Sequence, residues 1–495
     1  MNFIENTLWL LAVLPVLSGL LSLLMPSARL VLASTAAGVP VIAGMDLWVA
    51  VKIFMEGPMT SNGGWFRIDA LSAYHLAIMM IVFILSSFYA VSYFRNEPAA
   101  LRLTPGSARR FSALWHGALA AMTLVLISNN LGIMWVGVEA TTLLTAFLIC
   151  LHISTVSLEA TWKYLIVCSV GVAFAFMGVL LLAASAGAPI AGAPLLQWTY
   201  LHGMARILDP RLVKLSFIFL LVGYGTKAGL APMHSWLPDA HSQAPAPVSA
   251  IFSGFMLNMA LYCIMRHLPI VTQAVGNTAW TNNLLIFFGL FSILIAAVFI
   301  LSQHDLKRFL AYCSVEHIGI IMLGLGLGPL GVFAALFHTL NHSLSKTLVF
   351  FSAGRLGQIY GSHDMRSMKG TLRANPIWGG VLFAGILALI GVAPFAIFMS
   401  ELIILKAAAD TQKYFAIVLF LLGTGAVFVG ALRHAIDMAW GEKPEDIVST
   451  SNNSLIEWMI VIVPLALLLI LGVWMPAFFR NILELSAGMV TGGQP

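Results

Sequence analysis

Several apolar stretches of this chain run for about 18 or more residues without a charged side chain. A stretch of that length crosses roughly 30 Å of hydrocarbon as a helix that rises about 1.5 Å per residue. Of the 495 residues, 60% are hydrophobic and only 9% are charged, a balance far from that of soluble globular proteins. We therefore expect an all-α integral membrane protein.

Polar and Gly/Pro-rich breaks divide the apolar sequence into about fourteen transmembrane spans. We expect these spans near residues 4–24, 29–53, 70–93, 112–129, 131–151, 163–186, 212–236, 246–266, 283–302, 309–327, 331–354, 377–405, 414–434 and 456–477. The loops are too short for a soluble domain, so the spans form one bundle. Its expected parts are residues 1–110 (spans 1 to 3), 111–270 (spans 4 to 8), 271–440 (spans 9 to 13) and 441–495 (span 14).

Lysine and arginine residues at the span ends are more numerous on the side reached after odd-numbered spans. The positive-inside rule assigns that side to the cytoplasm, which predicts a multi-pass protein of the cell's inner (cytoplasmic) membrane with both termini outside. No basic segment precedes the first span, so we expect it to be retained and not cleaved as a signal. The dispersed net charge of +5 does not indicate nucleic-acid binding.

Two basic residues, Lys227 and Lys346, lie deep within predicted spans. A lysine at that depth is costly and needs a partner or a water-filled cavity. Lys227 is followed by Gly229 and Pro232, which interrupt span 7, and the backbone groups freed by such a break must be lined by protein or water. Together these features indicate an ion path.

The break in span 7 has a counterpart in span 12. The sequence GLAP at 229–232 recurs as GVAP at 391–394, and each broken span carries a charge, Lys227 in one and Glu401 in the other. Spans 7 and 12 are an odd number of crossings apart, so they run in opposite directions. We therefore predict an inverted repeat, 111–270 against 271–440, with two broken helices, a plan typical of transporters whose ion sites lie near the bilayer midplane.

Span 5 contains a single charge, Glu139, near its middle. A carboxylate there is either protonated or paired, and Lys227 is the candidate partner. Burial favours a neutral lysine whereas a nearby carboxylate favours a charged one, so such a pair can take up or release a proton when its geometry changes. The alternative is a static salt bridge that locks two helices together.

Span 11 carries His338, His342 and Lys346 at positions i, i+4 and i+8. At about 100° per residue these side chains form one stripe on one helix face. Histidine can pass a proton between its two ring nitrogens near neutral pH, so two histidines that lead to a lysine resemble a relay. The alternative is metal binding by the two histidines, which the neighbouring cationic lysine disfavours.

Three further polar groups fall in or beside spans. Span 10 contains Glu316 and His317, which either extend the relay or form a satisfied polar pair between helices. Glu401 lies late in span 12, where an interfacial carboxylate is the alternative. Asp239 and His241 follow the turn after span 7 and mark either a proton entry or a solvated loop.

Nothing in the sequence indicates a catalytic centre. The chain contains no GxSxG, no P-loop and no haem-ligand pattern beyond the histidine stripe. Its four cysteines lie in apolar spans and form no CxxC, so disulfides, zinc and iron–sulfur ligation are not expected. We expect no cofactor, no metal and no catalytic centre of the chain's own.

Several motifs resemble one family of membrane proteins. They are KAGLAPMHSWLPDAHSQAPAPVSA at 227–250, FRIDALS at 66–72, AYCSVEHIGI at 311–320, HTLNHSLSKTL at 338–348 and the span around Glu139. This set is similar to the proton-translocating antiporter-like subunits that respiratory complex I, Mrp-type sodium/proton antiporters and membrane-bound group 4 hydrogenases share. Within that family the motifs look most like hydrogenase-4 component F and its relatives.

The resemblance implies a central polar axis across the bilayer. Glu139 and Lys227 match the family's glutamate and broken-helix lysine, and Glu401 matches the charged residue of the second broken helix. The same comparison implies roles for the span-11 stripe and for the histidines that flank the Trp-Leu-Pro turn, which are His234 and His241. One departure is Asn258, where many relatives have a lysine, because asparagine can hold water but cannot carry the proton.

The resemblance also implies a function: a proton-translocating subunit of a redox-driven membrane complex of the hydrogenase or formate hydrogenlyase type, and thus a role as a subunit of an oxidoreductase complex. Its expected partners are other membrane subunits, a peripheral hydrogenase-like redox module, the lipid bilayer, and protons, with sodium as a second candidate ion. Two alternatives remain open. One is a standalone or Mrp-type cation/proton antiporter or an inorganic-carbon transport subunit, and the other is a structural anchor with a vestigial channel.

Overall fold

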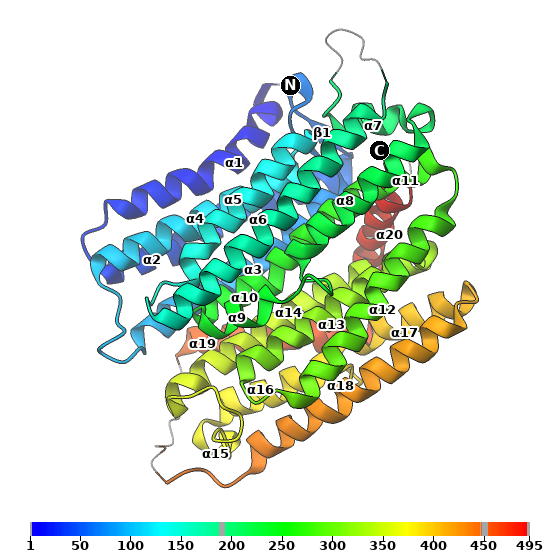
Figure 1. The fold of residues 1–495 in the computed structure, drawn as a ribbon. Helices are drawn as coiled ribbons and strands as arrows, with labels where there is room; N and C mark the ends of the chain where they lie inside the picture. Colours follow the sequence, from blue (N-terminus) through cyan, green and yellow to red (C-terminus); the bar gives the residue numbers. More distant parts are fainter. Residues whose placement is uncertain (1, 188–193, 446, 448–453, 493–495) are drawn as a thin grey trace.

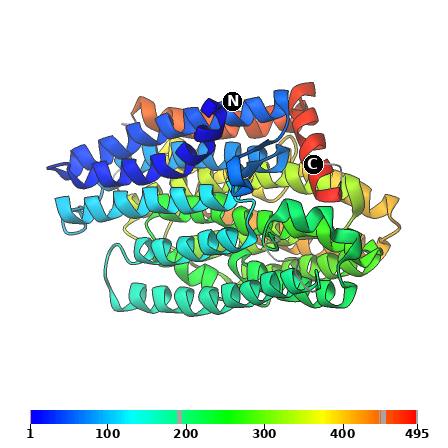
Figure 2. The same cartoon turned by 90° about the horizontal axis from the view of Figure 1, so that it is seen from above.

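The computed structural model describes residues 2–187, 194–445, 447 and 454–492. Within them the chain forms a bundle of long helices that lie side by side (Figure 1). The first helix begins and the last described helix ends toward the same end of this bundle (Figure 1). Seen from above, the N-terminal helices (blue) and the C-terminal helices (red) lie along one side, and the helices drawn in teal and green lie along the other (Figure 2).

The elements in chain order are α1 (Asn2–Leu23), α2 (Ala28–Glu56), β1 (Met59–Thr60), η1 (Asn62–Gly64), β2 (Arg67–Ile68), α3 (Ala70–Arg95), α4 (Pro105–Ile127), α5 (Leu131–Ile149), α6 (Thr155–Ala184), α7 (Trp198–Gly203), η2 (Ala205–Ile207), α8 (Pro210–Ala228), α9 (Trp236–Gln243), α10 (Ala246–Ile251), η3 (Phe252–Met256), α11 (Leu257–Val275), α12 (Thr278–Ser302), α13 (Leu306–Leu325), α14 (Gly328–Tyr360), α15 (Thr371–Ala374), α16 (Pro376–Leu389), α17 (Ala396–Asp410), α18 (Tyr414–Trp440), α19 (Leu455–Val473) and α20 (Ala477–Thr491). The two short strands pair antiparallel.

The predicted all-α membrane fold is confirmed. Every predicted span contains helix, and ten helices of the described residues are long and apolar enough to cross a membrane. Helix α4 begins seven residues before the predicted start of span 4, because Thr104 caps it by accepting a hydrogen bond from the Ser107 amide at 3.2 Å and Pro105 occupies its first turn. Helix α20 was not predicted, since its 15 residues are too few for a span.

Spans 7 and 12 are both broken, and the two breaks share their backbone geometry. After α8 the Leu230 amide donates to the Gly225 carbonyl at 2.9 Å, and after α16 the Val392 amide donates to the Leu387 carbonyl at 3.1 Å. The turning residue is a glycine with positive φ in each case, +79° at Gly229 and +68° at Gly391. The Ala–Pro bond that follows is cis in both. The GLAP and GVAP sequences therefore form the same turn twice.

Replacing Gly391 by alanine should destabilise the fold. Its positive φ disfavours any residue with a Cβ, and that Cβ would clash with Glu401 Oε2, so the carboxylate would have to move. We expect a loss of about 1–3 kcal/mol, measured as a lower melting temperature of the purified protein in detergent. The matched control is Gly425→Ala in α18, where a Cβ meets no atom within 4 Å and alanine favours the helix. Equal melting temperatures for the two variants would contradict this prediction.

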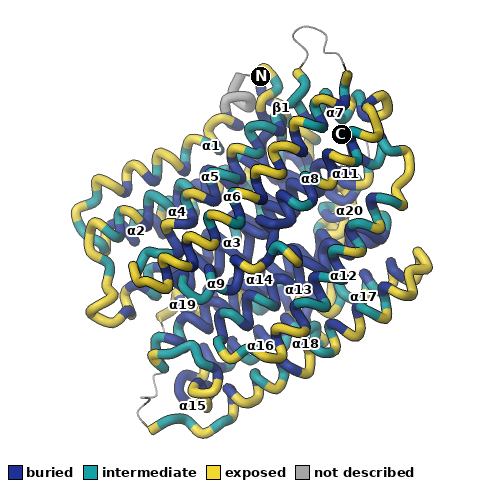
Figure 3. The backbone as a smooth tube through the Cα atoms, in the orientation of Figure 1, coloured by how far each residue is buried: buried dark blue, intermediate teal, exposed yellow. Residues whose placement is uncertain are grey.

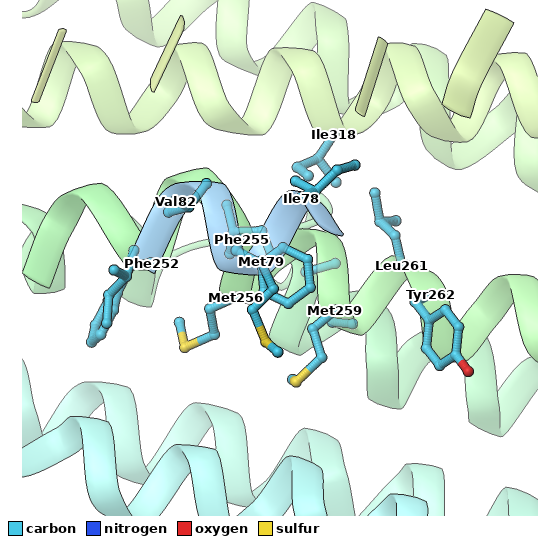
Figure 4. Packing of buried hydrophobic residues seen from close by; sticks show 14 of the residues in the cluster. Ile78, Met79, Val82, Phe252, Phe255, Met256, Met259, Leu261, Tyr262 and Ile318 are labelled. Atoms are coloured by element: carbon cyan, nitrogen blue, oxygen red, sulfur yellow. The ribbon is translucent and has the colours of Figure 1, made fainter. Parts of the chain in front are cut away.

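The most deeply buried part of the bundle is the middle, where α14 runs between the two broken spans. Figure 3 shows that the helices around α13 and α14 are buried along most of their length, whereas outer helices such as α18 expose one face. Span 8 is buried throughout and contains the π-helical turn η3. Hydrophobic side chains of η3 and α3, including Phe255, Met256 and Met79, pack closely around this turn (Figure 4).

Candidate functional site

The residues predicted to form a polar axis come from spans 5, 7, 8 and 10 to 12. Nine of the eleven are buried: Lys227, His234, His241, Asn258, Glu316, His317, His338, His342 and Lys346. The remaining two, Glu139 and Glu401, are half-buried. Buried polar groups are costly unless they are hydrogen-bonded or paired, so the partners of each group decide what the axis can do.

Lys227 lies in the last turn of α8, directly before the first helix break, and its side chain is fully buried. Its ammonium group donates to Thr142 Oγ1 on α5 at 2.9 Å and to the Tyr164 hydroxyl on α6 at 2.6 Å. It also lies 4.7 Å from the centre of the Tyr164 ring. Thr145 continues this network, with its hydroxyl 2.6 Å from that of Tyr164. Neutral hydroxyl groups therefore surround the lysine.

Glu139 does not form the salt bridge with Lys227 that the sequence allowed. One of its carboxylate oxygens accepts a hydrogen bond from Ser169 Oγ at 2.8 Å, and the other is buried without a partner in the described part of the chain. No ion pair among the described residues joins Glu139 to Lys227, although the two groups interact electrostatically. The static lock is therefore absent, and each group is free to change its charge without breaking an ion pair.

Three histidines from α13 and α14 form one cluster. His317 Nδ1 lies 2.9 Å from His338 Nε2, and the ring centres of His317 and His342 are 5.3 Å apart. His338 Nδ1 lies 2.9 Å from Ser400 Oγ at the first turns of α17. Both ring nitrogens of His342 are buried without a partner among the described groups. The histidine that the sequence left as half of a polar pair, His317, thus joins the predicted stripe.

Lys346 is held by a backbone carbonyl. Its ammonium group donates to Leu310 O on α13 at 2.8 Å. Ser314 Oγ donates to the same carbonyl at 3.2 Å and lies 2.7 Å from Ser253 Oγ on η3. The second buried lysine therefore resembles the first in having neutral partners, and a chain of hydroxyl groups links it to span 8.

Glu316 and Glu401 complete the charged groups around this lysine. Glu316 interacts electrostatically with both Lys346 and Glu401. Glu401 follows Ser400 in α17, and its carboxylate lies against Gly391 at the second helix break. The break, the serine that touches His338 and the terminal carboxylate are thus adjacent in space.

Asn258 contacts α14, the helix that carries the histidine stripe. Its amide nitrogen donates to Ser343 Oγ on α14 at 2.8 Å and to the Gly254 carbonyl at 3.2 Å, while its side-chain oxygen is buried without a described partner. Ser343 is the residue after His342. The asparagine that departs from the family pattern therefore still joins span 8 to span 11 through hydrogen-bonding groups.

The two histidines near the first break differ in their surroundings. His241, in α9, is fully buried, stacks on Phe350 of α14 with ring centres 4.8 Å apart, and has no partner for either ring nitrogen within the described residues. His234 lies in the break and contacts the rings of Phe299 and Tyr312. Of the two readings of His241, the buried position excludes a solvated loop.

Sequence reasoning missed several partners of these groups. Thr142 and Tyr164 around Lys227, and Ser343 and Ser400 beside the histidines, are common residue types in membrane helices, so only the fold reveals them. Asp239, which the sequence had marked together with His241, forms ion pairs with Lys163 at 2.5 Å and with Arg308.

Other buried charged residues lie outside the predicted set. Arg266, expected at a span end, is buried and paired with Asp69 at 2.5 Å, where it also donates to Tyr262 and Ser72. Asp46 in α2 is buried, and neither of its carboxylate oxygens has a partner in the described chain. Two of these residues could have been singled out from the sequence. Asp69 belongs to the FRIDALS motif, and Asp46 is an acidic residue within an apolar span.

The histidine cluster also bears on the metal alternative. Over residues 2–187, 194–445, 447 and 454–492, no group of three or more His, Cys, Asp or Glu side chains is arranged to hold a metal ion. The close contacts of His338 are instead with His317 and a serine hydroxyl, which are hydrogen-bonding partners. This arrangement suits transfer of a proton from group to group.

Comparison with known proteins identifies close sequence relatives. The family profile described as "NADH:quinone oxidoreductase/Mrp antiporter, TM" matches residues 128–427. The chain is similar to "Hydrogenase-4 component F homolog" of Methylacidiphilum infernorum (isolate V4), with 38% identity over 359 residues, which cover 72% of this chain and 75% of the relative. The matched profile includes both helix breaks and all eleven predicted site residues.

Two solved structures have a similar fold over nearly the whole chain. One is a chain of the membrane-bound sulfane sulfur reductase, an archaeal respiratory membrane complex, with a TM-score of 0.86, 23% identity, and coverage of 98% of this chain and 97% of that one. The other is a chain of the Mrp complex from Dietzia sp. DQ12-45-1b, with a TM-score of 0.86, 20% identity, and coverage of 99% and 98%. At these identities the likeness is one of fold.

Proposed function

The chain belongs to the NADH:quinone oxidoreductase/Mrp antiporter membrane family, and we propose that it translocates protons as one membrane subunit of a redox-driven complex. The observation that carries this proposal is the state of the two membrane lysines. Each is fully buried and hydrogen-bonded to neutral groups, Lys227 to two hydroxyls and Lys346 to a carbonyl. A lysine in such a site can exist with or without its proton, because no fixed countercharge holds it charged.

The proton moves along hydrogen-bonding side chains from one lysine to the other. Lys227 exchanges its proton through the hydroxyls of Thr142 and Tyr164, and span 8 forms the junction to the second half. From there Asn258 and Ser343 lead to the histidine cluster, and Ser253 and Ser314 lead to Lys346. Water must complete the junction, since the span-8 side chains that contact Tyr164 include those of Met256 and Phe252, which carry no proton.

The proton leaves the path at the second helix break. His338 touches Ser400, and the next residue, Glu401, is the last acidic group of the axis. Glu139 acts at the other end: it is half-buried on α5, so a charge change in a neighbouring subunit reaches it and alters the affinity of Lys227 for its proton. His234 and His241 flank the first break and serve as the entry.

Redox energy would come from outside this chain. The relative at 38% identity is named as a homologue of a hydrogenase-4 component, and this favours a peripheral hydrogenase-like module together with other membrane subunits as partners. The repeats 111–270 and 271–440 then form the two half-channels. The positive-inside bias supports a location in the inner membrane with both termini outside.

The junction at Asn258 provides the test of this path. Asn258→Leu keeps the number and branching of the side-chain heavy atoms but removes every hydrogen bond of the side chain, so we expect redox-driven proton uptake to fall by about tenfold or more. The measurement is quenching of a pH-sensitive dye in proteoliposomes that contain the whole complex, with electron transfer recorded in parallel.

The matched control is Met259→Leu, a buried neighbour that carries no hydrogen bond in the described network. It should leave proton uptake unchanged. Unaltered uptake in Asn258→Leu, with the complex assembled, would exclude the path through span 8 and would favour an anchor with a vestigial channel.

A second candidate function is cation/proton antiport. The fold match to the Mrp chain is as close as that to the respiratory chain, and sodium would be the exchanged ion. The same vesicles distinguish the two functions. Proton movement that requires a sodium gradient and no electron donor supports antiport, whereas movement that requires the donor supports the redox-driven pump.

A further inference from the structure

A cavity of about 700 Å³ opens where the ends of four helices meet. Two hydrogen bonds fix this meeting point. Gln358 on α14 donates to the Tyr93 carbonyl near the end of α3 at 2.9 Å, and Ser92 donates to the carboxylate of Glu457 in the first turn of α19. The first half of α2 supplies the remaining wall. The cavity shares no residue with the polar axis described above.

The end of this cavity at the helix termini is cationic. Arg95 and Arg355 both line it, and neither has an acidic partner among the ion pairs of the described residues. Arg355 Nε is buried without a hydrogen-bond partner in the described structure. A buried guanidinium donor in that state calls for an acceptor.

The acidic residue in the cavity, Glu457, offsets one of the two positive charges but forms no ion pair with either arginine. One oxygen of Glu457 accepts from Ser92, and the other accepts from the Ser454 amide at 2.9 Å as part of a helix cap. Both carboxylate oxygens are thus engaged by neutral donors. The remaining charge that faces the cavity is positive and suits an anion.

The other end of the cavity is apolar and deep. Its wall on α2 consists of Ala33, Ala36, Ala37 and Pro40, small residues that leave a groove along the helix. Pro40 lies about 18 Å along α2 from its first residue at about 1.5 Å per residue. The groove therefore extends from the membrane surface well into the hydrocarbon layer.

We propose that this cavity binds an anionic phospholipid, with the phosphate on Arg95 and Arg355 and one acyl chain along α2. A free phosphate would satisfy the arginines but leave the apolar wall uncovered, whereas a phospholipid matches both ends. Arginine recognises phosphate with paired N–H donors. Both arginines also lie on the side that the positive-inside bias assigns to the cytoplasm, where anionic lipids gather.

The bound lipid joins α2 and α3 to α14 and α19. Helix α14 carries the histidine stripe, so the lipid holds the N-terminal helices against the element that bears the proton-transferring groups. The site itself does not depend on the proposed function, because its argument uses only the cavity, the charges and the depth.

The test is lipid-dependent stability of the delipidated complex in detergent. Phosphatidylglycerol should raise the melting temperature more than phosphatidylcholine or inorganic phosphate does. Arg95→Gln/Arg355→Gln should require about tenfold more phosphatidylglycerol for half of that effect, since two charge-assisted contacts are lost. The control, Arg29→Gln/Arg433→Gln, removes two exposed arginines from the same predicted side and should behave as the wild type.

A second variant separates binding from folding. Ala37→Trp fills the groove from its exposed face and keeps both arginines, so it should weaken the response to phosphatidylglycerol without changing the stability measured in its absence. An unchanged phosphatidylglycerol response in both variants would overturn the proposal. An equal effect of inorganic phosphate on the wild type would overturn it as well, because the ligand would then be a free anion.

Discussion

Replacing Lys227 by alanine abolishes redox-driven proton uptake while the complex still assembles: this is the largest effect that we expect from a single substitution. Among the described residues, Lys227 is the only cation in its hydroxyl-lined site at the first helix break, and neither Thr142 nor Tyr164 can replace it as a proton carrier at neutral pH. We expect a decrease of about a hundredfold or more, measured by dye quenching in proteoliposomes with electron transfer monitored in parallel.

Two features make this experiment specific. Lys214 lies on the same helix but half-exposed beside Trp280, so Lys214→Ala removes a lysine from α8 without touching the buried network. It should retain full uptake. Because no acidic group of the described residues is paired with Lys227, its removal breaks no ion pair, and assembly should survive. Undiminished redox-driven proton uptake in Lys227→Ala would contradict the proposed mechanism.

Replacing Lys346 by alanine should have a comparable effect on the second half of the path. Its ammonium group and Ser314 share the Leu310 carbonyl, and this shared acceptor links the lysine to the hydroxyl chain from span 8. We expect uptake to fall by about a hundredfold. The measurement is the same, and the melting temperature of the complex is recorded with it.

The pair of readouts decides between a path and an anchor. An anchor predicts that Lys346→Ala changes the melting temperature and leaves the remaining proton movement as it was. A proton path predicts that proton uptake falls while the melting temperature stays the same. The fold should tolerate the change because the Leu310 carbonyl loses Lys346 as a donor but keeps Ser314. Ser345→Ala is the control, since this neighbour on α14 has a buried hydroxyl without a described partner.

The family resemblance drawn from motifs is confirmed by the profile match and by the relative at 38% identity. Much of the fold also follows from the sequence, because a membrane leaves apolar segments few alternatives to helix. The two GxAP breaks were predictable for the same reason: a lysine or glutamate beside a glycine and a proline has no ordinary place in a lipid-facing helix.

The partners of the site residues were not predictable. Glu139 and Lys227 were expected to meet, but the structure separates them and gives the lysine two hydroxyls. The positions of threonine and tyrosine in a membrane helix do not predict a contact with a buried lysine, since a threonine can bond the backbone of its own helix and a tyrosine can face lipid. His317 joined the stripe of α14 only through the packing of α13 on α14, which the spacing along one helix cannot reveal.

The π-helical turn η3 lets span 8 form hydrogen bonds with two neighbouring helices, α13 and α14. Ser253 and Asn258 are five residues apart, which in a regular α-helix turns them about 140° from each other. The wider turn, closed by a hydrogen bond from the Leu257 amide to the Phe252 carbonyl, holds one extra residue and reduces that angle. Ser253 therefore reaches α13 and Asn258 reaches α14, two helices that pack side by side. The extra residue rotates the residues that follow it about the helix axis, and this rotation brings both polar groups onto the same side of span 8.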